Sequence, residues 1–147
     1  EDPGRPASEI VNQVQLSRSI GNNYVGHVHW SAKALMQNRG GITSALAKGI
    51  YAAPALVPPM PWVSKARPAA PVASVNNVKN GTLVRWSRVP AASRYVLQAR
   101  YGSRWDTIAV THGGRFDFTL RGSPAAVAVC AVDRYGTTSR PAVMVGK

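Results

Sequence analysis

His27 and His29 are the residues best suited to bind a metal ion, because imidazole nitrogens are common zinc ligands. They lie in Val25–Trp30, whose aromatic and β-branched residues predict a strand, and a spacing of two places both side chains on one face of it. A zinc site needs further ligands, and no third residue has a suitable spacing. We therefore predict no metal, and assign the two histidines to packing or hydrogen bonding between this strand and its helices.

Covalent and cofactor chemistry find little support in the sequence. Cys130 is the single cysteine, so no internal disulfide can form. It alternates with Val129 and Ala131 along a predicted strand, which places it on the outer face, and without a basic partner we expect it to be unreactive. No GxGxxG, P-loop or GxSxG pattern is present, and no cofactor is predicted.

Acid–base chemistry would need paired carboxylates, and the chain has only six acidic residues. Asp106, Asp117 and Asp133 lie in or beside predicted strands and turns. Solvated or turn-capping roles are the usual ones for aspartate at such positions. We predict these roles for all three, and no catalytic residue.

The N-terminal part of the chain predicts helix, strand and helix. Ser8 is the expected N-cap of a helix from about Glu9 to Ile20, and Thr43 or Ser44 is the expected cap of a second helix. The strand Val25–Trp30 lies between them. One strand cannot satisfy its own hydrogen-bonding groups, so this piece requires a sheet that it does not itself contain.

A proline-rich segment separates the two parts of the chain. Six prolines between Pro54 and Pro71 each remove a backbone donor and fix φ, which excludes helix interior and central strand. Such a segment is typical of a semi-rigid spacer. We predict an α/β segment over residues 1–62, a Pro-rich linker over 63–71 and a β-sandwich over 72–147.

The C-terminal part predicts short strands at regular spacing. In Arg94–Arg100, Tyr95, Leu97 and Ala99 alternate with Val96, Gln98 and Arg100, as expected of a strand with one buried face. Further strands are expected over these ranges: Thr82–Trp86, Trp105–Ala109, Arg115–Thr119, Ala126–Val132 and Ala142–Val145. The fold class is therefore mainly β, an antiparallel sandwich preceded by an α/β fragment.

This C-terminal part resembles a fibronectin type III domain. The runs NGTLVRWSRVPAASRYVLQAR and VAVCAVDRYGTTS carry the resemblance, with Trp86 on the second strand and Tyr95 on the third. The sequence departs from the pattern at Ala125, near the position where that fold often has its corner tyrosine.

Charge is concentrated in the same part of the chain. The net charge is +12, of which +9 falls from Arg67 onward. Arg85, Arg100, Arg104, Arg115, Arg121, Arg134 and Arg140 occupy this part. Such a surface is either simply solvated or binds an anionic polymer of the cell envelope. No nucleic-acid-binding signature accompanies the charge, so nucleic acid is not the expected partner.

The N-terminal part resembles the C-terminal end of the bacterial glycoside-hydrolase-like family 10. The resemblance is carried by DPGRPASEIVNQVQLSR, GHVHWSAKAL and YAAPALVPPMPW. It implies that residues 1–62 are the end of a (β/α)8 barrel, with Val25–Trp30 as the last barrel strand and Ile42–Ala52 as the closing helix. The resemblance also implies that the remaining strands, with any catalytic acids, lie outside this chain.

Candidate substrate-binding residues follow from the same resemblance. It places Asp2 and Arg5 on the loop after the penultimate barrel strand, at the catalytic face. Asp2 either binds sugar hydroxyls there or caps a turn before Pro3. Trp30 and Ser31 close the last strand, where Trp30 either stacks on a sugar ring or packs within the barrel, and Lys33 follows in the adjoining loop.

The resemblance therefore implies the C-terminal portion of a bacterial cell-envelope glycoside hydrolase-like protein, periplasmic, lipoprotein-anchored or secreted, which acts on polysaccharide such as peptidoglycan glycan strands. We expect this chain alone to be inactive. The missing barrel portion is the expected partner that covers the apolar faces of residues 1–62. Self-association through residues 1–62 is the other way to cover these faces. The alternative is a non-catalytic basic module that binds anionic wall polymers or a partner protein. No apolar run approaches the roughly 20 residues of a membrane span.

Overall fold

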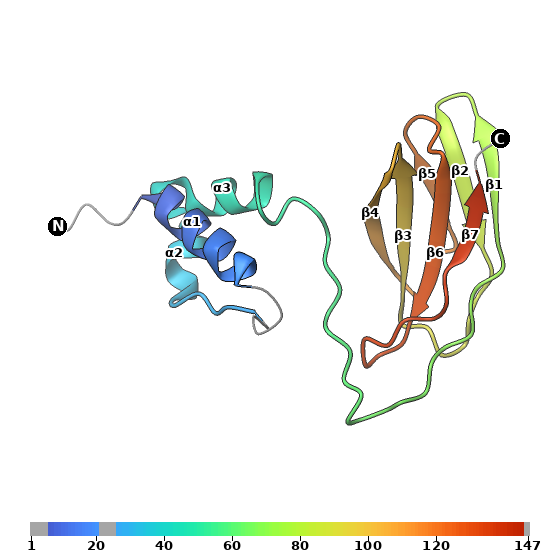
Figure 1. The fold of residues 1–147 in the computed structure, drawn as a ribbon, viewed down its shortest axis with the longest axis horizontal. Helices are drawn as coiled ribbons and strands as arrows, with labels where there is room; N and C mark the ends of the chain where they lie inside the picture. Colours follow the sequence, from blue (N-terminus) through green and yellow to red (C-terminus); the bar gives the residue numbers. More distant parts are fainter. Residues whose placement is uncertain (1–5, 21–25, 146–147) are drawn as a thin grey trace. The chain divides into compact units, whose positions relative to one another are not determined.

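The computed structural model describes residues 6–20 and 26–145, and divides the chain into two compact units, Glu1–Ala53 and Pro54–Lys147 (Figure 1). The first unit is helical and the second contains all the described strands. None of the described helices is long and apolar enough to cross a membrane.

The helical unit consists of α1 (Ala7–Ser19), α2 (Ala32–Met36), a short 3₁₀ turn (Arg39–Gly41) and α3 (Ile42–Lys48). Val14 of α1 packs with Ile42 and Leu46 of α3 as the buried apolar residues of the unit. Three buried side chains are a small core, so this unit has little of the apolar burial that stabilises an isolated domain.

Both predicted helices are confirmed, with different ends. Helix α1 begins after Pro6, whose carbonyl accepts the Glu9 amide at 3.0 Å, so Ser8 lies inside the helix instead of capping it. Proline is tolerated at this N-cap position because the backbone N–H that it lacks would have no partner within the first turn of the helix. Helix α3 begins after its N-cap Gly41, so Thr43 and Ser44 lie inside the helix instead of capping it, and it ends at Lys48, short of the predicted Ala52.

The strand predicted over Val25–Trp30 is wrong for the residues that the structure describes. Residues 26–30 belong to no helix or strand, and Val25 lies outside the described residues. A strand persists only when a neighbour pairs its backbone groups, and unit Glu1–Ala53 has no described strand to do so. Lys33, expected in a loop, instead lies in α2.

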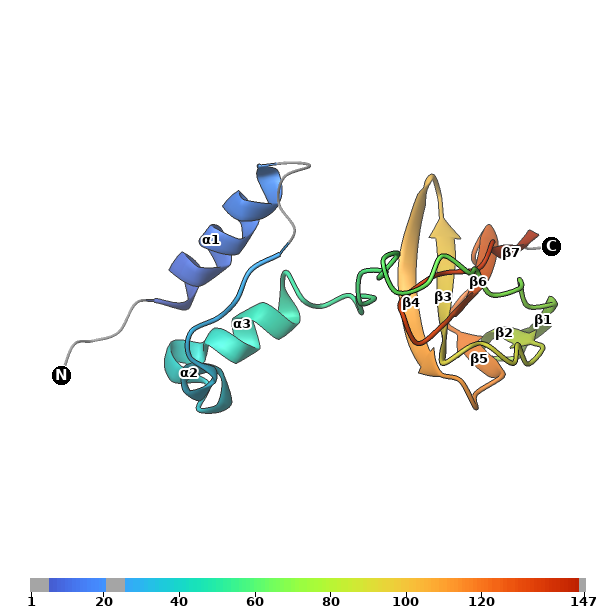
Figure 2. The same ribbon diagram turned by 90° about the horizontal axis from the view of Figure 1, so that it is seen from below.

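The second unit is a two-layer antiparallel sandwich, seen edge-on in Figure 2. One sheet has the order β1-β2-β5 and the other β4-β3-β6-β7. The bounds are β1 Ala73–Val78, β2 Gly81–Trp86, β3 Arg94–Tyr101, β4 Arg104–His112, β5 Asp117–Leu120, β6 Ala126–Val132 and β7 Ala142–Val145. The predicted fibronectin type III-like fold is confirmed.

The core of the sandwich follows the predicted alternation in β3, except that Val96, predicted on the outer face, is also buried. Tyr95, Leu97 and Ala99 of β3 are fully buried and face Val84 and Leu120 of the other sheet. The Tyr95 hydroxyl accepts a hydrogen bond from the Val89 amide at 2.8 Å. A buried phenol that finds a backbone donor satisfies both groups and fixes the turn between β2 and β3.

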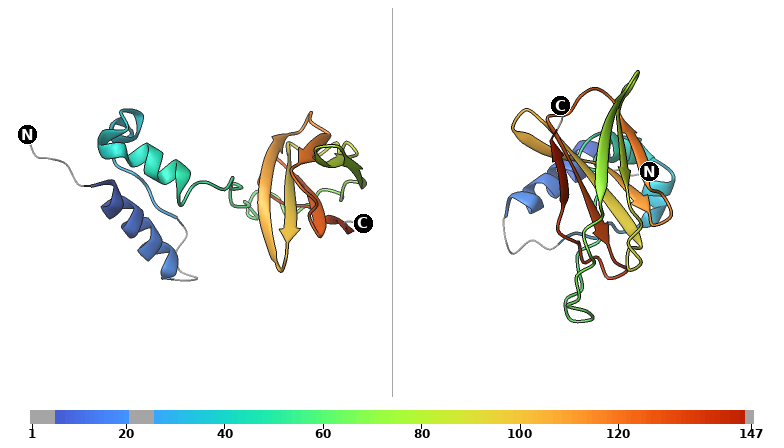
Figure 3. Two further views of the ribbon diagram at one scale, coloured as in Figure 1. Left: turned by 90° about the horizontal axis from the view of Figure 1, so that it is seen from above. Right: turned by 90° about the vertical axis from the view of Figure 1, so that its right-hand side faces the viewer.

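The Pro-rich segment is tied to the sandwich at several points. The Met60 amide donates to the Tyr135 carbonyl at 2.9 Å, and the Val72 and Ser87 residues exchange two hydrogen bonds of 2.9 and 2.8 Å. Pro68 and Pro71 are buried. In the right-hand view of Figure 3 the segment loops below the lower ends of the strands. The segment expected to act as a spacer is thus attached to the sandwich.

Candidate substrate-binding site

The candidate substrate-binding residues fall at two places in the helical unit. Asp2 and Arg5 lie outside the described residues. Trp30 ends the 26–30 segment, Ser31 is the N-cap residue of α2, and Lys33 lies in its first turn. Trp30 is 98% exposed, so its indole does not pack against the part of the chain that the structure describes.

A shallow pocket brings Trp30 beside residues that the sequence analysis did not place there. Its wall on one side is α1, through Ile10, Gln13 and Ser17, and on the other the segment from His27 to Trp30. Ser31 and Lys33 do not line it. An exposed indole next to polar side chains of a pocket is an arrangement in which an aromatic ring can stack on the apolar face of a sugar.

The two histidines meet at one tyrosine. The Nε2 atoms of His27 and His29 both contact the hydroxyl of Tyr51, and the His29 contact is 2.8 Å long. The rings of His27 and Tyr51 are stacked with their centroids 5.8 Å apart. The predicted hydrogen-bonding role of these histidines is confirmed, with the partner on the segment after α3.

Arg18 completes this cluster from α1. Its guanidinium lies 5.6 Å from the centroid of the Tyr51 ring and donates to the Ile50 carbonyl at 3.1 Å. A cation above an aromatic face is attracted by the ring quadrupole. Arg18, His27, His29 and Tyr51 therefore tie the 26–30 segment to α1 and to the end of α3. Their separation in sequence left no local signal from which Tyr51 or Arg18 could be predicted.

Metal binding has no support in the described part of the chain. No group of three or more His, Cys, Asp or Glu side chains there is placed to hold an ion. The Nε2 atoms of both histidines are directed at the Tyr51 hydroxyl.

The described acidic residues are engaged in structural contacts. Asp106 pairs with Arg104 at 2.8 Å, and Asp117 lies 3.9 Å from Arg115. Oδ1 of Asp133 accepts the amides of Tyr135 and Thr137, each at 2.8 Å. The turn-capping role predicted for Asp133 is confirmed, and Glu9 accepts a hydrogen bond from Gln13 on α1.

Cys130 is half-buried on β6, and burial raises the pKa of its thiol. A raised pKa lowers the fraction of thiolate, the reactive form. This agrees with the expectation that Cys130 is unreactive, although the side chain is less exposed than the alternation suggested.

We expect the helical unit to lose stability on acidification because of His27. Partial burial, and then the charges of His29 and Arg18, lower the pKa of His27 below its ordinary value of 6.5. The unfolded chain therefore binds a proton at a pH where the folded unit does not, so stability falls as pH decreases through the range below about 6.5.

An NMR titration of the imidazole protons measures this directly. The His27 midpoint should lie below 6.5, and Arg18→Gln, which removes one of the causes, should raise it. A His27 midpoint at or above the ordinary value would contradict the structure.

Comparison with known proteins relates this chain to a glycosyl hydrolase. No family model matches it. Glycosyl hydrolase YngK of Bacillus subtilis strain 168 is 30% identical over 118 residues, which are 76% of this chain and 23% of YngK. This chain is homologous to a glycosyl hydrolase. It thus spans less than a quarter of the length of that relative.

Several solved structures resemble part of the chain. A variant of the domain FN3tt is 24% identical, with a TM-score of 0.45, and the match covers 52% of this chain and 90% of that one. The glycoside hydrolase domain of Endo-D from Streptococcus pneumoniae R6 is 18% identical, with a TM-score of 0.45, over 57% and 16% of the two chains. A fibronectin type III domain of human collagen XX is 16% identical, with a TM-score of 0.41, over 62% and 99%.

Proposed function

We propose that this chain is the C-terminal portion of a bacterial cell-envelope glycoside hydrolase that acts on polysaccharide, with peptidoglycan glycan strands as substrate. The homology to YngK carries the proposal, together with the share of that relative which the chain spans. The rest of the barrel, with the catalytic acids, would precede Glu1 in the complete protein.

We also propose that this chain alone does not catalyse hydrolysis. Cleavage of a glycosidic bond requires two carboxyl groups that face each other across the bond. Each acidic side chain that the structure describes is instead held by a structural partner, as shown above for Asp106, Asp117 and Asp133. In the complete protein, Trp30, Ser31 and Lys33, with Asp2 and Arg5, would bind sugar units near the catalytic acids.

Exposed apolar side chains of the helical unit support a missing partner. Val28 is 92% exposed, Trp30 98% and Met36 86%. Apolar area gains about 25 cal/mol per Å² when it is buried, so such residues are normally covered. We propose that the remaining barrel covers them, and that in its absence a second copy of the chain can do so.

The test compares this chain with the complete protein on purified glycan strands. Release of reducing ends by the complete protein, and none by this chain, is the expected result. Turnover by this chain alone would refute the inactive-fragment proposal, and inactivity of the complete protein on every glycan offered would refute the hydrolase proposal.

The second candidate is a binding module, and the charge of the sandwich unit favours it. Its exposed basic residues include Lys79, Arg85, Arg88, Arg94, Arg104, Arg115, Arg121, Arg134 and Arg140. An excess of cations of this kind raises the local concentration of anionic polymers, in a way that salt screens. Pull-down on cell-wall sacculi should succeed at low ionic strength and weaken as salt is added, and absence of binding at low ionic strength would refute this role.

A further inference from the structure

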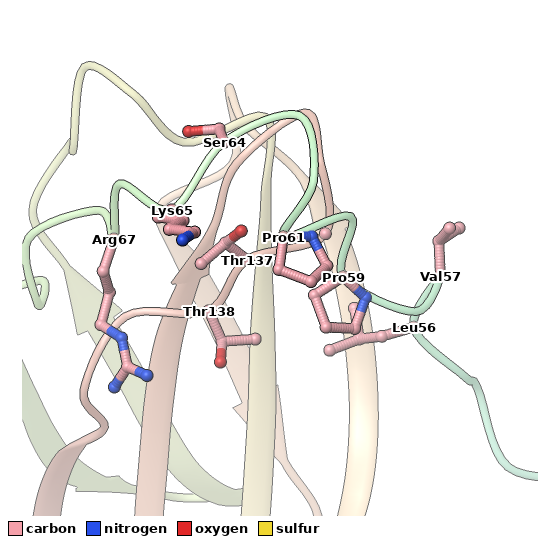
Figure 4. Close-up of a pocket in the computed structure, with 10 residues that line it drawn as sticks. Leu56, Val57, Pro59, Pro61, Ser64, Lys65, Arg67, Thr137 and Thr138 are labelled. Carbon is pink, nitrogen blue, oxygen red and sulfur yellow. The ribbon is translucent and has the colours of Figure 1, made fainter.

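A pocket within the sandwich unit lies between the Pro-rich segment and the turn that joins β6 to β7 (Figure 4). Pro59 and Pro61 form an apolar wall, and the side chains of Lys65, Arg67, Thr137 and Thr138 lie opposite them. The cavity holds about 370 Å³, within the range of roughly 300–1,000 Å³ common for ligand pockets. All its lining residues belong to unit Pro54–Lys147, and none is among the candidate substrate-binding residues named above.

The pocket is built on an ordered turn. Oδ1 of Asp133 accepts two amides of this turn, and the Asp133 amide donates to the Thr137 carbonyl at 3.0 Å. Gly136, in the same turn, has φ +82° and lies against the Pro-rich segment. A Cβ at this position would come within 2.8 Å of the Val57 carbonyl oxygen. The hydrogen bond from Met60 to Tyr135 joins the two walls. The Asp133 carboxylate therefore positions the turn and does not line the pocket.

The charge of the lining is positive. Lys65 and Arg67 are exposed, no acidic residue is among the lining residues, and neither cation forms an ion pair with any residue in 6–20 or 26–145. A ligand with a carboxylate would gain charge-assisted hydrogen bonds from both. No helix end contributes to the lining, which lacks the amide cradle typical of phosphate sites.

The remaining groups fit a sugar ring. Proline rings present a flat apolar surface against which the C–H face of a pyranose can pack, and the two threonine hydroxyls can both donate to and accept from sugar hydroxyls. Apolar walls with a few convergent polar groups are the general form of a small-molecule site.

We propose that this pocket binds a carboxylate-bearing sugar unit of an acidic glycan, with the ring against Pro59 and Pro61 and the carboxylate at Lys65 and Arg67. The inference rests on the docking role proposed above and gives it a site. It places recognition of the polymer in one pocket instead of spreading it over the basic surface.

The test uses soluble probes on the full 147-residue chain, followed by calorimetry or NMR shifts. Trigalacturonic acid carries the carboxylates, maltotriose has the same length without them, and glycerol 3-phosphate offers phosphate alone. We expect binding of trigalacturonic acid with weak or absent binding of the other two. Equal binding of maltotriose, or preference for glycerol phosphate, would overturn the assignment to a carboxylated sugar.

Matched variants locate the site. The double variant Lys65→Gln/Arg67→Gln should weaken trigalacturonic acid binding by roughly tenfold or more, since hydrogen bonds to charged groups are the strong ones. Lys79→Gln/Arg88→Gln removes the same charge elsewhere in the sandwich unit and should leave the affinity within about twofold. Equal losses in the two double variants would mean diffuse attraction and would overturn the pocket.

Gly136→Ala provides a second test without any change of charge. It should displace the Pro-rich segment and abolish binding, whereas Gly102→Ala, at φ +66° with nothing within 4 Å of its Cβ, should bind normally. Full binding by Gly136→Ala would overturn the proposal. The pocket and the docking role can fail separately: trigalacturonic acid binding without sacculus binding removes only the docking role, and sacculus binding that survives the Lys65/Arg67 variant removes only the pocket.

Discussion

Backbone amides of β3 and β6 are expected to exchange at least about a thousandfold more slowly than those of residues 26–30. The β3–β6 ladder runs from the Arg94–Val132 pair to the Arg100–Ala126 pair, and most of its side chains are buried. Such amides exchange only when the sandwich unfolds, and a domain stability of about 5 kcal/mol slows exchange by three to four powers of ten. Residues 26–30 belong to no helix or strand and are mostly exposed.

Residue-resolved hydrogen exchange measures both regions in one sample, and the ladder serves as the internal control. If residues 26–30 become protected as the protein concentration is raised, a second copy of the chain covers the segment, as proposed above for its exposed apolar side chains. Strong protection of 26–30 in a dilute monomer would show a self-sufficient helical unit. The fragment interpretation would then fail.

Replacement of Gly81 by alanine is expected to destabilise the sandwich by about 3 kcal/mol or more. Gly81 begins β2 at φ +142°, and a Cβ there would lie 1.9 Å from the Leu120 carbonyl oxygen. Relief of that overlap requires β2 to move away from β5 at the Thr82–Leu120 pair. For a domain of this size the melting temperature should fall by roughly 10–20 °C.

Calorimetry of the full chain measures the change, and Gly102→Ala is the matched control. Gly102 also has positive φ, in the turn between β3 and β4, with open space around its Cβ. Its replacement by alanine should cost only the free energy of placing a non-glycine residue at positive φ, about 1–2 kcal/mol. Equal melting temperatures for the two variants would show that the contact with Leu120 is not a constraint on the fold.

The sandwich was predictable because its signal is local. Alternation along Arg94–Arg100 assigns each side chain to a face within a few residues, and Tyr95, Leu97 and Ala99 are buried as it indicates. It does not predict that Val96, on the other face, is buried as well. The buried residues of α3 were predictable for the same reason, since Ile42 and Leu46 lie four residues apart, at helical spacing. Homology to a glycosyl hydrolase was likewise visible in motifs of the helical unit.

What the sequence left open depends on partners distant in the chain. The residue types of Val25–Trp30 favour a strand. A strand forms only where another strand pairs with it, and unit Glu1–Ala53 has no described strand beside residues 26–30. The contact of His27 with Tyr51 joins residues 24 apart in sequence, and the hydrogen bond between Met60 and Tyr135 joins residues on either side of strands β1 to β6. Periodicity carries no information about such contacts. Only the tertiary structure could show that the Pro-rich segment forms one wall of a pocket, because the other wall is the turn between β6 and β7, which is distant from that segment in the sequence.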